Sequence, residues 1–185
     1  SSILMLGTTV LASLGQEKLT YDLLVLLIMR ELGPILIAFI VTARSATAIA
    51  TEISTMVVGH EIEAYISVGI DPISHLAAPR FLGVTFSMFF LNIYFSSFGL
   101  IAPGLIIQFI STTNLFQSIS LKIILISVIK SLAFGMIISG SATMYGFSAG
   151  RASTEIPLAG LKAVSKAFLF IILGDVFITV LSYIL

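Results

Sequence analysis

The sequence of 185 residues contains no cysteine, which excludes disulfide bonds, thiolate nucleophiles and sulfur-ligated metal sites. Charged residues are also scarce: they make up 10% of the chain, against roughly a quarter in soluble domains. The formal net charge is zero, so the chain exerts no long-range attraction on nucleic acid. Hydrophobic residues, in contrast, make up 58% of the chain, and the mean hydropathy is +1.15. This composition predicts an integral membrane protein.

The motifs of several common enzyme classes are missing as well. There is no phosphate-binding G-x-x-x-x-G-K-[ST] loop, no H-E-x-x-H and no G-x-S-x-G. His60 and His75 stand fifteen residues apart across an expected helix break, which is a poor basis for a metal site. We therefore expect no catalytic residue, metal or cofactor in this chain. An intramembrane enzyme that uses Arg30, Lys130 and Asp175 is the alternative from another class, and turnover by the isolated chain would favour it.

Four stretches are long and apolar enough to cross a membrane, because a spanning helix needs about 20 largely apolar residues. They cover residues 23–50, 81–110, 121–144 and 163–185. A fifth run, 3–14, is too short, and we interpret it as the end of a truncated helix; a signal peptide is the alternative, although no basic region precedes the run. The predicted fold class is an all-α, polytopic transmembrane bundle with four full spans and a truncated first one, five in the intact protein. Residues 1–185 then form one N-terminally truncated domain.

Two of these spans contain residues that interrupt helices. Gly33 and Pro34 lie in the first full span, and Pro103 lies in the next one. Proline removes a backbone hydrogen bond and kinks a helix. Inside a membrane such a break needs protein or water beside it rather than lipid.

Between these two spans lies a polar segment, residues 52–80, which gathers four of the nine acidic residues and both histidines. Its expected structure is one helix that runs on from the preceding span to about Val58, and a second helix over 61–68. Asp71 caps the following segment and Pro72 opens it. Basic residues near the span ends favour this side as cytoplasmic: Arg44, Arg80, Arg151, Lys162 and Lys166 lie on it, whereas Lys18 and Lys122 lie on the other.

Three isoleucines give the expected helix 61–68 an apolar stripe. Ile62, Ile66 and Ile70 recur every four residues, while Glu61 and Glu63 project elsewhere. Such a helix can dock into a groove of a soluble domain. The alternative is an interfacial or re-entrant loop that packs on its own bundle.

Four charged residues lie inside the spans: Arg30, Glu31, Lys130 and Asp175. At roughly 1.5 Å per residue, all four reach a similar depth below the far end of the bundle. Neighbouring residues do not face one another on a helix, so we expect Arg30 and Glu31 each to find a partner on another span. The result is a neutral interior cluster, which either pins the bundle as a salt-bridge network or contacts a substrate head group.

An ordered set of motifs resembles the signature of the MlaE (YrbE) family of ABC-transporter permeases. The set comprises Arg30-Glu-Leu-Gly-Pro34, Ala43-Arg44, Ala50-Thr-Glu-Ile53, Glu61-Ile-Glu-Ala64, Gly69-Ile-Asp-Pro72, Pro79-Arg80, Lys130-Ser131 and Asp175-Val-Phe-Ile-Thr179. It covers nearly the whole chain. The chain departs from the family at residues 155–164, where Pro157 and Gly160-Leu161 replace the usual glycine and threonines.

The resemblance implies a homodimeric permease that moves phospholipid or a related lipid between a membrane and an MCE-domain carrier. A separate cytoplasmic ATPase would bind ATP and Mg and would dock on the polar segment. By this resemblance, which extends to the EAA loop of ABC importers, the coupling residues are Glu52, Glu61, Ile62, Glu63, Ala64, Ile66, Gly69, Asp71 and Pro72. The expected location is a bacterial inner membrane or a plastid inner envelope. An ABC importer permease for a small polar solute is the alternative, and a lipid that co-purifies with the protein would distinguish the two.

Overall fold

The computed structural model describes residues 30–106 and 121–184, and every regular element in these ranges is a helix. The elements are α3 (Gly33–Val41), η2 (Thr42–Ala46), α4 (Thr47–Val58), α5 (Glu61–Ser67), η3 (Ile73–Ala77), α6 (Ala78–Ile106), α8 (Leu121–Phe147) and α9 (Glu155–Ile184). The expected all-α fold class is thereby confirmed. The truncated helix over 3–14 and the start of the span expected over 23–50 lie outside the described residues.

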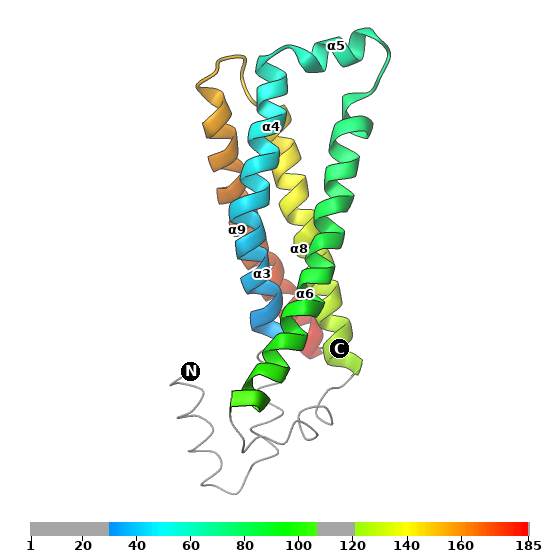
Figure 1. The fold of residues 1–185 in the computed structure, drawn as a ribbon, viewed down its shortest axis with the longest axis vertical. Helices are drawn as coiled ribbons and strands as arrows, with labels where there is room; N and C mark the ends of the chain where they lie inside the picture. Colours follow the sequence, from blue (N-terminus) through cyan, green and yellow to red (C-terminus); the bar gives the residue numbers. More distant parts are fainter. Residues whose placement is uncertain (1–29, 107–120, 185) are drawn as a thin grey trace, which may run out of the picture.

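Four helical segments have the length and composition to cross a membrane: Arg30–Val58, Ile73–Phe98, Lys122–Phe147 and Glu155–Ser182. They correspond to the four expected spans, but at the end that carries α5 they run several residues past the apolar stretches. The reason is physical: hydropathy marks the hydrocarbon core of the membrane, whereas a helix continues until its hydrogen bonding is stopped. The polar segment is therefore mostly helix extension, and only α5 and its two flanking turns leave the bundle (Figure 1).

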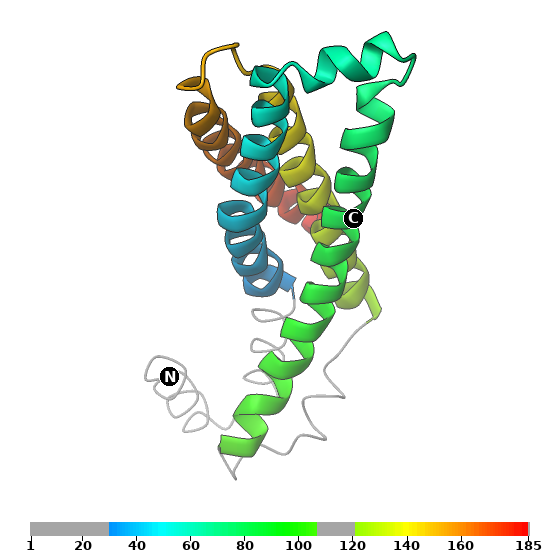
Figure 2. The same cartoon turned by 45° about the horizontal axis from the view of Figure 1, so that its top comes forward.

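The long helices form a bundle, and α5 lies across one end of it, between the ends of α4 and α6 (Figures 1 and 2). The core joins all four spans through Ile37 and Ala38 of α3, Met88 of α6, Phe134 and Ile138 of α8, and Ile171 of α9. Small residues on one face of α8 allow α6 to approach closely. A Cβ at Gly135 would lie 2.7 Å from Thr85 Cα, and Ser131 and Ser139 beside it are fully buried.

The expected helix breaks take a milder form. Residues 30–32 form a π-helical turn that leads directly into α3, with Pro34 in the first turn of α3. The missing N–H of proline costs least in such a first turn. At Pro103 an interruption was expected, yet α6 continues as one helix from Ala78 to Ile106. Proline inside a membrane helix is tolerated where local adjustments satisfy the freed carbonyl group.

The turns around α5 follow the expected pattern. α4 ends at Val58, and the chain turns through Gly59 and His60, whose φ of 59° is left-handed. Gly69, with φ 79°, ends α5: its N–H donates to Ile66 O at 3.0 Å, and the N–H of Ile70 donates to Tyr65 O at 2.9 Å. This pair of bonds is a Schellman motif, whose left-handed residue is usually glycine.

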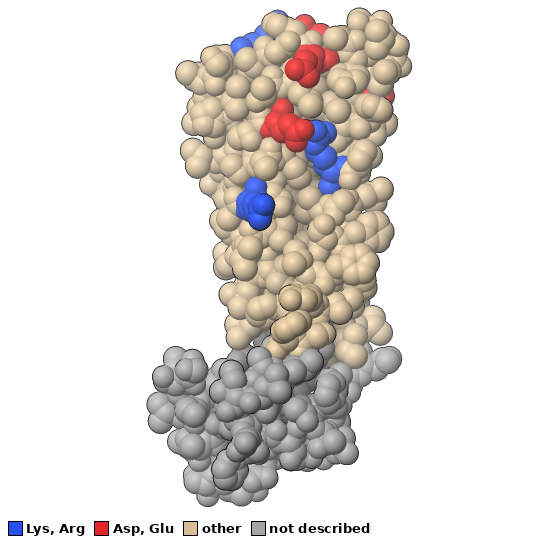
Figure 3. Space-filling model, in the orientation of Figure 1, with Lys and Arg blue, Asp and Glu red and all other residues tan. Residues whose placement is uncertain are grey.

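Large hydrophobic side chains are exposed along the outside of the bundle, for example Ile40, Phe90, Phe177 and Ile184. On the face shown in Figure 3, the charged side chains lie over the upper part of the molecule, and the described surface below them is uncharged. An apolar band with polar groups at one end is the surface of a membrane-embedded bundle. The chain is therefore an integral membrane protein.

Candidate functional site

Helix α5 stands free of the bundle core. None of its residues is buried, and Ile66 and Ile70 of the expected stripe are 61% and 39% exposed. Ile62 is half-buried. The stripe therefore presents apolar surface at the end of the molecule that bears the polar segment.

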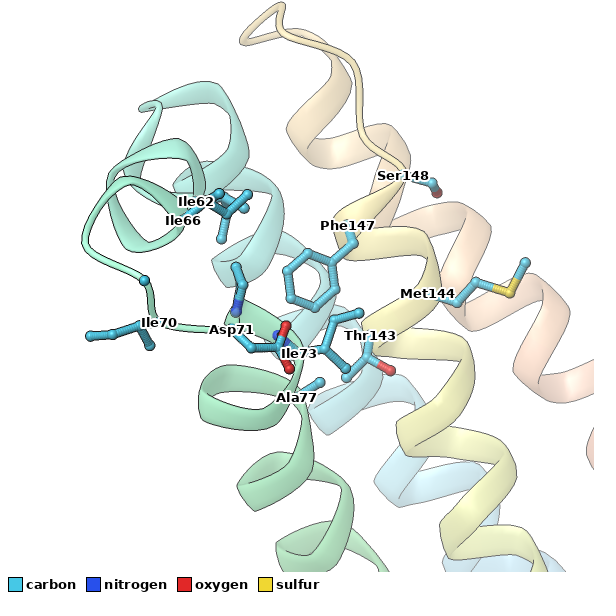
Figure 4. A pocket seen from close by; sticks show the side chains of 12 residues that line it. Ile62, Ile66, Ile70, Asp71, Ile73, Ala77, Thr143, Met144, Phe147 and Ser148 are labelled. Carbon is cyan, nitrogen blue, oxygen red and sulfur yellow. The ribbon is translucent and has the colours of Figure 1, made fainter.

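Beneath α5 lies a pocket of about 920 Å³. Ile62, Ile66 and Ile70 line one side of it, and Phe147 and Met144 of α8 line the other (Figure 4). Ile62 and Ile66 face Phe147 across this hollow and leave it open, whereas the Ile70 side chain points away from α8 (Figure 4). The alternative in which the stripe packs on its own bundle is thus only partly realised, because room remains for a partner's side chains.

Two of the three glutamates in the polar segment are engaged within the chain. Glu63 accepts a hydrogen bond from Arg151 at 2.7 Å, and its other oxygen lies 3.0 Å from His60 Nδ1. Glu52 accepts from Arg80 at 2.7 Å. Glu61 is exposed and forms no ion pair within the described ranges. Of these acids, Glu61 is therefore the one available to an outside partner.

Arg151 places the loop between α8 and α9 beside α5, since it bridges 88 residues of sequence to reach Glu63. Figure 1 shows this loop at the same end of the bundle as α5. Sequence reasoning used Arg151 only for orientation. Its partner could not be found from the sequence, because a pair of residues 88 positions apart produces no local periodic pattern.

Asp71 caps the helix that begins at Pro72. Its carboxylate accepts hydrogen bonds from the backbone N–H of Ile73 at 3.2 Å and of Ser74 at 3.1 Å, and also from the Ser74 hydroxyl. The side-chain bond from Ser74, followed by the two backbone bonds, lowers the pKa of Asp71. Asp71 thus acts in shaping the turn after α5, as its position before Pro72 predicts.

The four charged residues of the spans meet in the interior. Lys130 Nζ donates to Glu31 Oε2 and to Thr179 Oγ1, both at 2.7 Å. It also lies 2.8 Å from Asp175 Oδ1, an ion pair whose geometry is not that of a hydrogen bond. Lys130 is fully buried. The cluster therefore joins α8 and α9 to the turn that precedes α3.

Arg30 completes the cluster in an unexpected way. We expected partners on other spans, and Arg30 does donate to Ser182 of α9. However, its Nε also lies 3.3 Å from Oε1 of the adjacent Glu31. The π-helical turn at 30–32 and the length of both side chains allow neighbours in sequence to meet. Sequence reasoning missed Thr179 and Ser182, because hydroxyl residues are too common in membrane helices to stand out.

A bundle of spans with a projecting, partly apolar helix at one end has the form of a transporter's membrane subunit. Comparison with known proteins identifies which kind. The model of the family described as Permease MlaE matches residues 2–181. The chain therefore belongs to the MlaE permease family, as its motifs indicate, and it is an ABC transporter permease.

Similar proteins occur in bacteria and in a plant. A probable ABC transporter permease protein of Rickettsia typhi is 30% identical over 174 residues, which cover 90% of this chain and 67% of that protein. The intermembrane phospholipid transport system permease protein MlaE of Haemophilus influenzae is 26% identical over 185 residues, covering 96% and 71%. The chloroplastic protein TRIGALACTOSYLDIACYLGLYCEROL 1 of Arabidopsis thaliana is 26% identical over 175 residues, covering 88% and 48%.

Proposed function

We propose that this permease moves phospholipid or a related lipid between its membrane and an MCE-domain carrier protein. It works as a homodimer with a separate cytoplasmic ATPase, which binds ATP and Mg. The observation that carries the proposal is the exposed apolar stripe of α5, at the end of the bundle that holds the polar segment. The name of the Haemophilus relative, which specifies phospholipid transport between membranes, supports the choice of cargo.

The ATPase would dock on α5 and on the pocket beneath it. Ile66 supplies apolar surface, Glu61 supplies a free charge, and the pocket between Ile62 and Phe147 gives room for an inserted side chain. A short amphipathic helix that enters a groove of a soluble domain is a common recognition mode. Glu63, held by Arg151, would fix the angle of α5 rather than contact the partner.

Force applied at α5 has a direct route into the membrane. α4 follows η2 and α3 in one helical segment of 29 residues, Arg30–Val58, so a displacement of Val58 is transmitted along this segment to Glu31 near its other end. At its far end Glu31 is bonded to Lys130 of α8, which contacts Asp175 of α9. We propose that the charge cluster makes these helices move together, opening and closing a lipid cavity at the dimer interface. The membrane would be a bacterial inner membrane or a plastid inner envelope.

The test replaces Glu61 with lysine in the permease expressed together with its ATPase. We expect Glu61→Lys to release the ATPase in pull-down and to abolish ATP-dependent transfer of phospholipid from donor vesicles. Lys122→Glu is the matched control, since it makes a charge change of the same size at the opposite end of the bundle. If the Glu61→Lys protein retained both the ATPase and lipid transfer, the docking surface would be refuted. Purified protein that carries no phospholipid would instead favour a polar solute as cargo.

A further inference from the structure

A second hollow lies on the lateral surface of the bundle, between α8 and α9. It measures about 700 Å³ and is almost entirely apolar. On α9, Phe170, Leu173 and Phe177 line it and are 48%, 59% and 68% exposed. On α8 it is lined by Met136, Gly140 and Met144, among others. Because Gly140 has no side chain and a Cβ there would meet nothing within 4 Å, the floor of this groove is open.

Two lysines continue the α9 wall of the groove toward the polar segment. Lys166 precedes Phe170 by four residues and Lys162 precedes Lys166 by four, so all three lie along one stripe of the helix. Both lysines are exposed. Lys162 lies 3.8 Å from Glu155, a loose and solvated pair, and Lys166 forms no ion pair with any residue that the structure describes. At Lys166 the groove thus ends in a positive charge that no described acid neutralises.

The lysines stand at the depth of the membrane surface. From Ala167 to the end of α9 at Ile184, Asp175 is the single charged residue, and these 18 residues extend about 27 Å. That length is close to the roughly 30 Å of hydrocarbon in a bilayer. Lys166 therefore marks the boundary at which apolar helix gives way to head groups, and lysine at such a position extends its ammonium group into the head-group layer.

We propose that the α8–α9 groove binds an anionic phospholipid, with an acyl chain along Phe170 and Phe177 and the phosphate held by Lys166 and Lys162. Basic residues at the cytoplasmic edge of a groove between membrane helices are a recognised arrangement for anionic lipid head groups. The proposal requires only that the chain spans a membrane. It therefore goes beyond the proposed transport function, and this lipid is a resident one rather than the cargo.

A second copy of the chain fits this groove poorly. In a dimer whose two-fold axis runs along the membrane normal, equivalent residues of the two copies lie at the same depth. A contact through this groove would bring Lys166 toward Lys166 of the other copy, and the described lining residues include no acid to neutralise them. An anionic lipid supplies the missing negative charge.

Native mass spectrometry of the detergent-purified permease with its ATPase provides the test. The probes are phosphatidylglycerol and phosphatidylcholine with identical palmitoyl and oleoyl chains. We expect the wild type to bind phosphatidylglycerol more tightly, and Lys166→Gln and Lys162→Gln each to weaken that binding roughly fivefold. Gly140→Leu fills the groove and should abolish binding of either lipid at this site. Lys122→Gln removes a lysine at the other end of the bundle and should leave the preference unchanged.

Three results would overturn the proposal. One is equal binding of the two lipids by the wild type, and another is an undiminished preference in the Lys166→Gln, Lys162→Gln double variant. The third is a change of oligomeric mass in Gly140→Leu, which would show that a second copy covers the groove. Because Lys162, Lys166 and Gly140 lie outside the polar segment and the charge cluster, the same variants should retain lipid transfer. A result that contradicts the lipid-binding groove can therefore be distinguished from one that contradicts the proposed transport function.

Discussion

Lys130 of α8 and Glu31, 99 residues earlier in the chain, are joined by a hydrogen bond of 2.7 Å in the interior of the bundle. The same ammonium group lies 2.8 Å from Asp175 of α9. With Arg30 beside Glu31 at 3.3 Å, two cations and two anions form a cluster whose formal charges cancel. A fully buried lysine is tolerated because each charge has an opposite charge beside it.

This balance predicts that single substitutions in the cluster are worse than a matched pair. Lys130→Met leaves one excess negative charge and Asp175→Asn leaves one excess positive charge, and breaking a buried pair in this way costs about 3 to 5 kcal/mol. The double variant restores neutrality, so we expect it to be more stable than either single variant. The measurement is the unfolding temperature of the purified permease in detergent, monitored by size-exclusion chromatography of heated samples.

Lys130→Arg serves as the control for this cycle, because it keeps the charge while changing the shape of the group. The unfolding temperature of Lys130→Arg should fall between those of the wild type and Lys130→Met. A double variant that loses the sum of the two single losses would show that Lys130 and Asp175 act independently. Lys130 would then depend chiefly on Glu31 and Thr179, its two hydrogen-bonded partners.

The cluster also shows how far sequence reasoning reaches. Depth along a helix is a matter of counting residues, so the common level of Arg30, Glu31, Lys130 and Asp175 could be predicted. The direction in which each side chain points was not predictable in the same way, because a π-helical turn at 30–32 changes the helical phase. Adjacent Arg30 and Glu31 lie in contact at this turn, although neighbours in a regular α-helix project in different directions.

The polar segment was predictable for a related reason. Its breaks depend on local chemistry: Gly59, Gly69 and the Asp71-Pro72 pair stop or start helices wherever they occur. The role of Glu63 was not predictable, because its partner Arg151 belongs to a different loop. Local rules therefore defined the helices at this end of the molecule, and only the three-dimensional arrangement shows which of the acids are free.

The Glu63 and Arg151 pair predicts a rescue by charge exchange. Glu63→Arg and Arg151→Glu should each loosen α5, because the bond ties α5 to the loop between α8 and α9. The pair is exposed, with 55% and 75% of the two side chains accessible, so its contribution is at most about 1 kcal/mol. Amide hydrogen exchange in α5 should accelerate up to about fivefold in each single variant and return toward the wild-type rate in the double variant.

His60 provides a control for the charge-exchange experiment, since it contacts the other oxygen of Glu63. His60→Gln removes the imidazole contact but leaves the Arg151 bond intact, so it should change amide exchange in α5 less than Arg151→Glu does. If amide hydrogen exchange in α5 were as fast in the double variant as in the single variants, the bond between Glu63 and Arg151 would not be what orders α5.

The cap at Asp71 predicts a dependence on pH. Hydrogen bonds to the carboxylate hold the pKa of Asp71 below its ordinary value of about 3.9. The charged form is therefore bound more strongly in the folded turn. Its stabilising effect is complete above the ordinary pKa and is lost as the pH falls through the lowered one. Carboxyl-carbon NMR of aspartate-labelled protein should show this titration below the range of an unperturbed aspartate.

A substitution of Ser74 tests whether the lowered pKa of Asp71 comes from this specific hydrogen bond or from the helix end in general. Its side-chain hydrogen bond is the largest cause of the shift, so Ser74→Ala should raise the pKa of Asp71 toward the ordinary value. Asp71→Ala should remove the signal and increase amide exchange at Ile73 and Ser74, whose N–H groups then lose their acceptor. An unchanged pKa in Ser74→Ala would contradict the assignment.

The contact of α6 with α8 at Gly135 predicts a sharp contrast between two glycines of one helix. A Cβ at Gly135 would lie 2.7 Å from Thr85 Cα, which is backbone and can retreat only if the helices separate. At Gly140, five residues on, a Cβ would meet nothing within 4 Å. We therefore expect Gly135→Val to destabilise the permease by about 1 to 3 kcal/mol and Gly140→Val to leave it close to the wild type. Both variants place the same β-branched residue in α8, so the difference between their unfolding temperatures in detergent isolates the helix contact. Equal unfolding temperatures would mean that α6 and α8 can move apart at no cost, and that Gly135 is not what sets their close approach.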